Sequence, residues 1–273
     1  MTNFLLADSH CHILDPRLNS RAEEIASRLN DDGLEFIVEI SASPQESKEA
    51  LAFAEKHDNV YCTIGVHPIM AHKVTQEFEH WALAQKSKKI IAVGECGLDY
   101  YDHGKLPGSP HDGSTPRDVQ KEIFIRHIMI ADKLKLPLVI HMRDAFKDML
   151  VVLTENKKFI RNGILFHCFS EGASEVERIR EHFDSYFAFG GAVTYTNKKM
   201  RGKSDEAIRA VPLDRLLIET DAPYLSPEPL RGKINEPKNV RIVAEYVARV
   251  LGLPFEAVAA ATLENTKRFF RLT

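Results

Sequence analysis

The sequence lacks long apolar runs. No stretch of its 273 residues approaches the ~18 consecutive apolar residues that a membrane-spanning helix requires. The N-terminus has no basic region, and its apolar run of about four residues is shorter than the ~7–15 of a secretory signal. We therefore expect a soluble, cytoplasmic protein that does not interact with membranes.

Cysteine is also scarce, and the charges of the two signs nearly balance. The 4 cysteines are far apart and include no C-x-x-C pair, which argues against a structural zinc ribbon or a disulfide framework. The formal net charge of -3 gives no global attraction to nucleic acid. Binding of a polyanion would therefore depend on a local basic surface or on bound metal.

Short runs rich in β-branched and apolar residues recur along the chain. Each is apolar throughout, as buried parallel strands are. They cover residues 4–8, 35–41, 60–66, 90–96, 136–142, 164–169, 186–193 and 216–220. Segments of helical period lie between them. Residues 119–134 are the clearest case. A second amphipathic helix is predicted after Pro237, and a closing helix is predicted over residues 254–270.

This alternation of strands and helices predicts an α/β fold, a (β/α)8 barrel of the TIM type. An open doubly wound sheet is the alternative. No repeat, low-complexity tract or linker divides the chain, so residues 1–273 are predicted to form a single domain. The Gly- and Pro-rich segment 101–116 is interpreted as an enlarged loop, either a lid over the active-site face or a variable surface insertion.

The residues able to bind metal stand at the C-terminal ends of the predicted strands, where barrel enzymes place their chemistry. The sequence D-S-H-C-H at residues 8–12 ends the first strand. Because extended side chains alternate between faces, His10 and His12 point the same way. An H-x-H pair is a weak signal by itself, since a single strand histidine is more often a satisfied core residue.

Other predicted strands also end in a carboxylate or an imidazole. Each alone fits a capping role, but imidazoles and carboxylates that converge on one barrel mouth would be costly to desolvate without a cation. Glu95 lies on the central strand of the set, where its two oxygens can bridge two ions. We therefore predict two divalent ions, with zinc, manganese or cobalt favoured and magnesium possible. The predicted ligands are His10, His12, Glu95, His141, His167 and Asp221.

Two more residues at the barrel mouth are candidates for substrate contacts. His67 could contact substrate or could be a loop histidine ordered by the proline that follows it. Arg143 could hold a phosphate oxygen, or it could form a buried ion pair with Asp144 or Glu219. Basic residues after the last two strands could form a rim for a polyanion, although such runs are more often simply solvated. They are Lys198, Lys199, Arg201, Lys203, Arg231 and Lys233.

At these residues the sequence resembles the TatD family of metal-dependent deoxyribonucleases, within the wider amidohydrolase-like barrels. The matching motifs follow one another over nearly the whole chain: DSHCH at 8–12, GVHP at 65–68, GECGLDY at 94–100, HMRDA at 141–145, FHCFS at 166–170, LIETDAPYL at 217–225 and RGKINEP at 231–237. The motif at 217–225 is quite specific, whereas H-x-H is shared by many related barrels. Glu95 stands where other binuclear relatives carry a carboxylated lysine.

The resemblance implies hydrolysis of phosphodiester bonds in single-stranded DNA, with two metal ions activating water. His10, His12 and Asp221 would hold one ion and His141 and His167 the other, with Glu95 bridging them. Asp221 would also orient or deprotonate the water, and His67 and Arg143 would steady the scissile phosphate.

Two other functions remain open. The first is hydrolysis of an amide, a lactone or an aminoacyl ester, because the same metal pair activates water toward any of these. The second is a non-catalytic metalloprotein scaffold. DNA is the expected partner as substrate, and no obligate protein partner is inferred.

Overall fold

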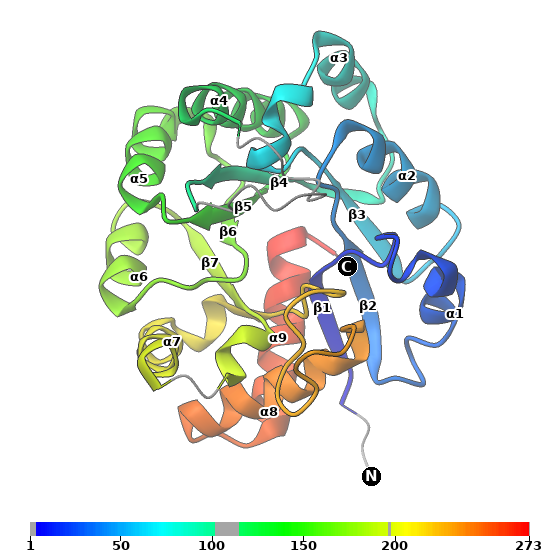
Figure 1. The fold of residues 1–273 in the computed structure, drawn as a ribbon, viewed down its shortest axis with the longest axis vertical. Helices are drawn as coiled ribbons and strands as arrows, with labels where there is room; N and C mark the ends of the chain where they lie inside the picture. Colours follow the sequence, from blue (N-terminus) through cyan, green and yellow to red (C-terminus); the bar gives the residue numbers. More distant parts are fainter. Residues whose placement is uncertain (1–3, 102–114, 196–197, 273) are drawn as a thin grey trace.

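The computed structural model describes residues 4–101, 115–195 and 198–272. Its strands form one sheet in which all neighbours are parallel and follow sequence order, from β1 to β8. The helices surround these strands (Figure 1). The predicted (β/α)8 barrel is thus confirmed, and the open doubly wound sheet is wrong. The strands are β1 Leu6–Cys11, β2 Leu34–Glu39, β3 Val60–Ile64, β4 Ile90–Asp99, β5 Leu138–Arg143, β6 Ile164–Phe166, β7 Ser185–Phe189 and β8 Leu216–Ile218.

The barrel closes between the end of β1 and the residues just after β8, a junction that we call the closing seam. The main-chain N–H of Asp221 donates to the His10 carbonyl at 2.9 Å, and that of His12 donates to the Ala222 carbonyl at 2.7 Å. Cys11 and Ala222 form a parallel bridge between the two segments. The chain therefore brings its first and last strand ends together at one place on the barrel mouth.

The helices connect the strands and end at recognisable signals. α2 begins with Ser43, whose side chain accepts from the Glu46 N–H, and with Pro44 in the first turn. α8 ends at Gly252, which adopts the left-handed conformation. The predicted helices at 119–134, after Pro237 and at 254–270 are confirmed as α4, α8 and α9. The helix bounds are α1 Ala22–Ser27, α2 Pro44–Ala54, α3 Gln76–Ala84, α4 Arg117–Leu134, α5 Phe146–Glu155, α6 Ala173–Arg180, α7 Lys198–Ala210, α8 Val240–Leu251 and α9 Phe255–Phe270.

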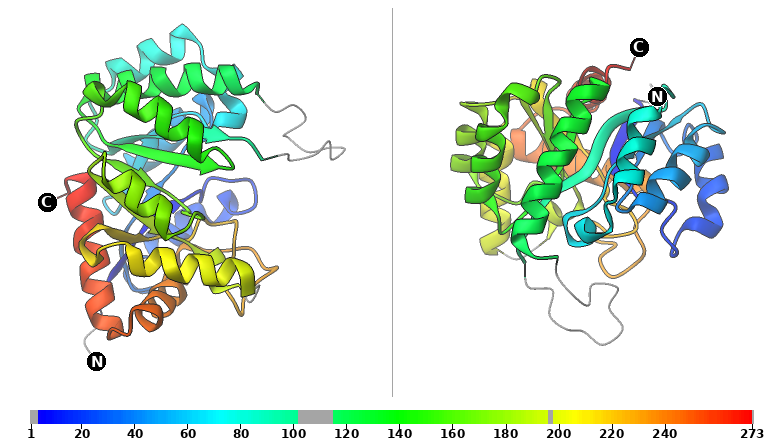
Figure 2. Two further views of the ribbon diagram at one scale, coloured as in Figure 1. Left: turned by 90° about the vertical axis from the view of Figure 1, so that its left-hand side faces the viewer. Right: turned by 90° about the horizontal axis from the view of Figure 1, so that it is seen from above.

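Two apolar layers hold the barrel together. The larger layer packs the outer faces of the strands against the helices. The smaller one fills the barrel interior with strand residues and is completed by Phe269 and Phe270 of α9. Figure 2 shows α9 at one end of the barrel and the loop after β8 at the other. Because α9 covers the end at which the strands begin, the mouth at their C-terminal ends is left for polar side chains.

Strand β4 is longer than the sequence predicts, and the difference matters for the site. It runs to Asp99 rather than ending at Cys96, and Gly97 and Asp99 pair with His141 and Arg143 of β5. A Cβ atom at Gly97, which has a φ of 140°, would meet the carbonyl oxygen of His141. Glycine thus permits the close approach that extends the strand and brings Asp99 to the barrel mouth.

The predicted enlarged loop lies mainly at residues 102–114, which are outside the described residues. Within the ranges described above, the structure contains no helix that combines the length and the apolar character needed to cross a membrane.

Candidate metal centre

The residues predicted to bind metal lie together at the barrel mouth in two sets. The first set joins the two sides of the closing seam. His10 Nε2 lies 3.3 Å from His12 Nε2 and 3.6 Å from Asp221 Oδ1, and His12 Nε2 lies 3.5 Å from the same oxygen. The second set comes from β5 and the end of β6, where His141 Nδ1 lies 3.1 Å from His167 Nε2.

Glu95 stands between these two sets. Its Oε1 lies 2.8 Å from His141 Nδ1 and 2.7 Å from His167 Nε2. Its Oε2 faces the other set, 3.6 Å from His10 Nε2 and 3.9 Å from His12 Nε2. The residue sits in an irregular part of β4, where the register with β5 shifts between Val93 and Cys96. The two carboxylate oxygens therefore address two different histidine pairs.

The electrostatics of the cluster follow from burial and from the opposed charges. Burial acts to raise the pKa of Glu95, but the imidazoles around it hold that pKa well below its usual value. Burial also opposes protonation of His12, yet the Asp221 carboxylate raises the His12 pKa to about 9. Burial also disfavours the protonated form of His167, but the negative charge of Glu95 stabilises that form and raises the His167 pKa. For His10, burial and His167 lower the pKa instead.

In three of the predicted ligand histidines, the ring nitrogen that points away from the cluster (the far nitrogen) faces an acceptor. His12 Nδ1 lies 3.0 Å from the Ile40 carbonyl oxygen, and His141 Nε2 lies 3.1 Å from Asp99 Oδ2. His167 Nδ1 lies 3.5 Å from Glu219 Oε1. An acceptor at the far nitrogen holds the proton there and leaves the lone pair of the near nitrogen toward the cluster, which is the tautomer that a metal ligand needs.

His67 has the opposite arrangement. Its Nδ1 accepts from the Ile69 main-chain N–H at 3.3 Å, so the ring proton belongs on Nε2, which lies 3.7 Å from Glu95 Oε1. Burial, with His141 next to it, lowers the His67 pKa to about 3. The ring is therefore a neutral N–H donor aimed at the cluster. This tautomer fits the predicted substrate contact. His67, Glu95 and His141 also have donor atoms within 4.8 Å of one another, close enough to hold an ion.

Arg143 lies at the rim of the mouth. Its guanidinium is 3.6 Å from the centroid of the Tyr101 ring. The basic rim predicted after the last strands is only partly described, because the side chains of Lys198, Lys199 and Arg201 lie outside the described residues. Of the others, Lys203 pairs with Glu171 at 2.8 Å, and the Arg231 guanidinium lies 4.4 Å from the Tyr195 ring centroid.

Three buried carboxylates around the cluster were not predicted to contact the ligands. Asp99 and Glu219 face the far nitrogens of ligand candidates, as described above. Asp8 accepts from the Thr220 main-chain N–H at 2.8 Å and from the Thr220 hydroxyl, next to Asp221 with its left-handed φ of 58°. All three belong to the same strand-end motifs as the predicted ligands, so their position in these motifs could have indicated that they lie near the cluster.

The donor set of the cluster fits divalent metal ions. Donor atoms of one tetrahedral site with bonds of ~2.0–2.1 Å lie roughly 3.3 Å apart, and the first set has separations of 3.3, 3.5 and 3.6 Å. Nitrogen-rich sites with one or two carboxylates suit zinc, manganese or cobalt. The structure thus brings the six predicted ligands and His67 together, and their roles stay predictions.

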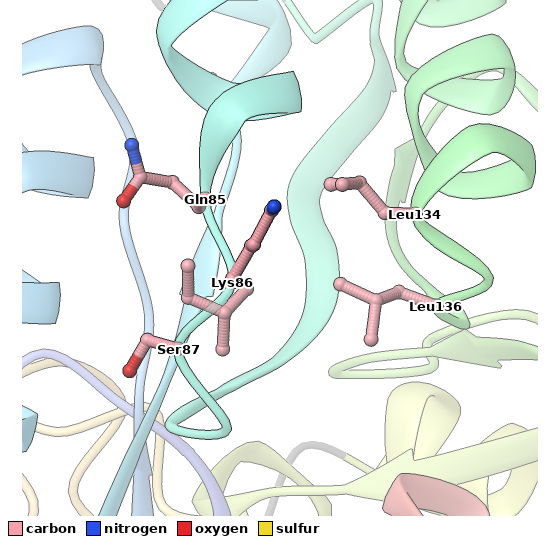
Figure 3. Close-up of a pocket in the computed structure, with 6 residues that line it drawn as sticks. Gln85, Lys86, Ser87, Leu134 and Leu136 are labelled. Atoms are coloured by element: carbon pink, nitrogen blue, oxygen red, sulfur yellow. The ribbon is translucent and has the colours of Figure 1, made fainter.

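A hollow elsewhere on the molecule offers no comparable chemistry. It has a volume of about 160 Å³ and lies beside Ile90 and Leu136, near the start of β4 and before β5, away from the mouth. Figure 3 shows that Gln85, Lys86 and Ser87 line one side and Leu134 and Leu136 the other. The lining contains no carboxylate or imidazole, so this hollow lacks the groups that bind a divalent metal ion.

Comparison with known proteins places the chain in a family. The family model described as TatD related DNase matches residues 7–271. The chain belongs to the TatD family of metal-dependent hydrolases. Among its TatD relatives, the uncharacterized metal-dependent hydrolase YabD of Bacillus subtilis is 38% identical over 269 residues, which cover 98% of this chain and 100% of YabD.

Two other TatD relatives extend this picture. The uncharacterized metal-dependent hydrolase YcfH of Escherichia coli is 35% identical over 272 residues, which cover 98% of this chain and 96% of YcfH. The crystal structure of YJJV, a TatD homolog from the same species, superposes with a TM-score of 0.86 at 26% identity and covers 100% of both chains. The resemblance stated from the motifs is thus confirmed for the family and for its barrel.

Proposed function

We propose that this TatD-family protein hydrolyses phosphodiester bonds of single-stranded DNA with two divalent ions. The observation that carries the proposal is the position of Glu95, whose two oxygens face two separate histidine pairs. A carboxylate in this position can bridge two ions. When bound, such a pair activates water and stabilises both the attacking and the leaving oxygen of a phosphoester.

The residues of the chain divide the remaining work. His10, His12 and Asp221 would hold one ion and His141 and His167 the other, with Glu95 shared between them. Asp221 would orient the attacking water or take its proton, because its carboxylate is more exposed than that of Glu95, 13% against 4%, and its lowered pKa keeps it ionised and able to accept. His67 would donate its Nε2–H to a phosphate oxygen, and Arg143 would add a charged donor at the rim.

Arginine–tyrosine pairs at the mouth favour a nucleic acid over a small ester. The Arg17 guanidinium lies 4.1 Å from the Tyr224 ring centroid, and the Tyr224 ring lies edge-on to His12 with centroids 5.9 Å apart. The Tyr224 side chain is exposed. The Arg143–Tyr101 and Arg231–Tyr195 pairs described above add further aromatic faces and charge. Aromatic faces beside positive charge bind unpaired bases and the phosphates that join them.

The test compares substrates on metal-loaded protein. Purified protein with manganese or zinc is assayed on a single-stranded oligonucleotide, on the same sequence as a duplex, and on an aminoacyl ester, with Asp221→Asn prepared in parallel to measure contaminating nuclease. We expect cleavage of the single strand by the parent and little by the variant. Cleavage of the ester alone would establish the amide or ester hydrolase instead. Tightly bound metal without turnover of any substrate would support the scaffold.

A further inference from the structure

The imidazoles of His10 and His167 form a parallel pair between two carboxylates. Their ring centroids lie 3.9 Å apart with an interplanar angle of 11°. At the Nε2 side of both rings lies Glu95, at 3.6 Å from His10 and 2.7 Å from His167. At the opposite side lies Glu219, which follows β8. One of the paired rings belongs to each of the two proposed metal sites.

Glu219 is placed rigidly on this inner side. Its side chain is completely buried, and its main-chain N–H donates to the Phe189 carbonyl of β7 at 3.1 Å. Its Oε1 accepts from the Cys168 main-chain N–H at 2.6 Å, directly after His167. The carboxylate is therefore fixed by its own backbone and by the turn that carries one of the two rings.

Three buried polar atoms of His10, His167 and Glu219 lack hydrogen-bond partners among the described residues. Within the described part of the chain, His10 Nδ1, His167 Nδ1 and Glu219 Oε2 have no hydrogen bond at normal distance. One nitrogen of each ring and one oxygen of Glu219 nevertheless lie within 4.8 Å of one another, and His167 Nδ1 is 3.5 Å from Glu219 Oε1. An ionised carboxylate only accepts hydrogen bonds, so it matches two N–H donors. Buried groups of this kind are normally paired.

We propose that Glu219 is a positioning residue shared by both metal sites, which accepts from the Nδ1–H groups of His10 and His167. This contact holds both rings in the tautomer whose Nε2 lone pair points toward Glu95. The inference rests on the proposed metal centre and goes beyond it, because it assigns the coupling of the two sites to a residue that touches neither ion. The other acceptors at far nitrogens each face a single ring: Asp99 faces His141, and the Ile40 carbonyl faces His12.

The substitution Glu219→Gln tests this sharing. Glutamine has nearly the same volume and offers one oxygen and one NH2 group, so one ring would face a donor and the other would keep only a neutral acceptor in place of a carboxylate. Because hydrogen bonds to an ionised acceptor are the stronger ones, both rings lose stabilisation. Loss of an outer partner of a ligating histidine typically weakens metal binding by roughly 10- to 100-fold. We expect both zinc affinities to fall by about this factor, measured by competition with a chromophoric chelator.

Two matched variants serve as controls. Asp99→Asn weakens the outer acceptor of His141 and leaves His10 and His167 unchanged, so it should lower at most one of the two affinities. Glu39→Gln changes another buried strand-end carboxylate, which accepts from the main-chain N–H groups of Ile13 and Leu14 at 2.7 and 3.2 Å. It should leave both affinities within about twofold, because Glu39 hydrogen-bonds no ligand ring. Equal losses in Glu39→Gln and Glu219→Gln would overturn the specific role of Glu219.

A second measurement reports the Nδ1–H groups of the two rings directly. In the zinc-loaded parent, nitrogen-15 NMR of the histidine rings should show protons on Nδ1 of His10 and His167 with the shifts of strong hydrogen bonds, and in zinc-loaded Glu219→Gln at least one of these Nδ1–H signals should lose that shift. A purely structural role would leave these signals in place. Nδ1–H signals that are unchanged in the variant, or loss of only one zinc affinity, would overturn the shared role. A parent that binds no metal would overturn the proposed function as well, and is recognised by the parent titration alone.

Discussion

Glu95 and His167 approach more closely than any other carboxylate and histidine of the described cluster, with Oε1 and Nε2 2.7 Å apart. The other Glu95 oxygen faces His10 at 3.6 Å. One carboxylate thus touches residues of both proposed metal sites, and its removal should have a different effect from removal of a histidine.

Replacement of Glu95 by alanine should lower the occupancy of both metal sites together, because a bridging ligand serves both ions. His167→Ala should chiefly empty one site. Elemental analysis of the two purified variants, loaded and desalted in the same way as the parent, separates these outcomes. Two tightly bound metals per chain in Glu95→Ala would show that the carboxylate does not bridge.

Replacement of Asp221 by asparagine should lower turnover while the fold survives. Asparagine keeps the shape and an oxygen ligand but removes the charge and the basicity of the carboxylate. General acid–base groups typically contribute about 10²- to 10⁴-fold, so single-turnover cleavage of single-stranded DNA should slow by that factor, with a much smaller change in DNA affinity. Thermal unfolding and metal content are measured beside it. Near-parental cleavage would remove Asp221 from proton handling, and loss of metal together with activity would leave it a ligand role alone.

Tyr224 should bind a base of the substrate. Its Oη donates to Asp15 Oδ2 at 3.0 Å, so Tyr224→Phe tests this bond while it keeps the ring, and Tyr224→Leu removes the ring. Base–aromatic stacking corresponds to roughly 5- to 150-fold in affinity. We expect such a loss in Tyr224→Leu, no comparable loss in Tyr224→Phe, and a smaller loss when the oligonucleotide carries abasic positions. Equal losses for normal and abasic strands would assign the ring to loop packing.

Glu39 should make the stability of the metal-free protein depend on pH. Burial raises its pKa to about 7, above the usual value of 4.5. Between these two pH values the folded state binds more protons at this residue than the unfolded state does, so the contribution of Glu39 to stability falls as the pH rises. The unfolding free energies of parent and Glu39→Gln should therefore shift by about 3 kcal/mol in favour of the variant from pH 5 to pH 8. Urea denaturation in the presence of EDTA measures this, and a constant difference would refute it.

The architecture could be predicted from the sequence because its signals are local. Buried parallel strands are apolar throughout, and the barrel geometry places their C-terminal ends at one mouth. That rule alone predicts that His10, Glu95 and His167 lie close together, although they come from three different strands or strand ends. The two apolar layers do not indicate which polar residues belong to the candidate site.

The rest depends on contacts made only after the barrel closes. Asp99 reaches His141 because β4 continues beyond its expected end beside a glycine. The position of Glu219 under two rings depends on the distance between β1 and the end of β6, which no local pattern records. His67 is distinguished from the predicted ligands by a single main-chain N–H, that of Ile69. These are tautomer and tertiary effects, and residue types in a linear sequence do not show them.

The closing seam gives the proposed first ion a mechanical role. His10 and His12 stand on one side of the seam and Asp221 on the other, and two main-chain hydrogen bonds cross between them. A cation bound by all three side chains would hold the two sides of the closing seam together, at the point where the barrel can open. Amide hydrogen exchange of His12 and Asp221 should then slow when metal is added, and chelation should make the barrel begin to unfold by separating its first strand from its last.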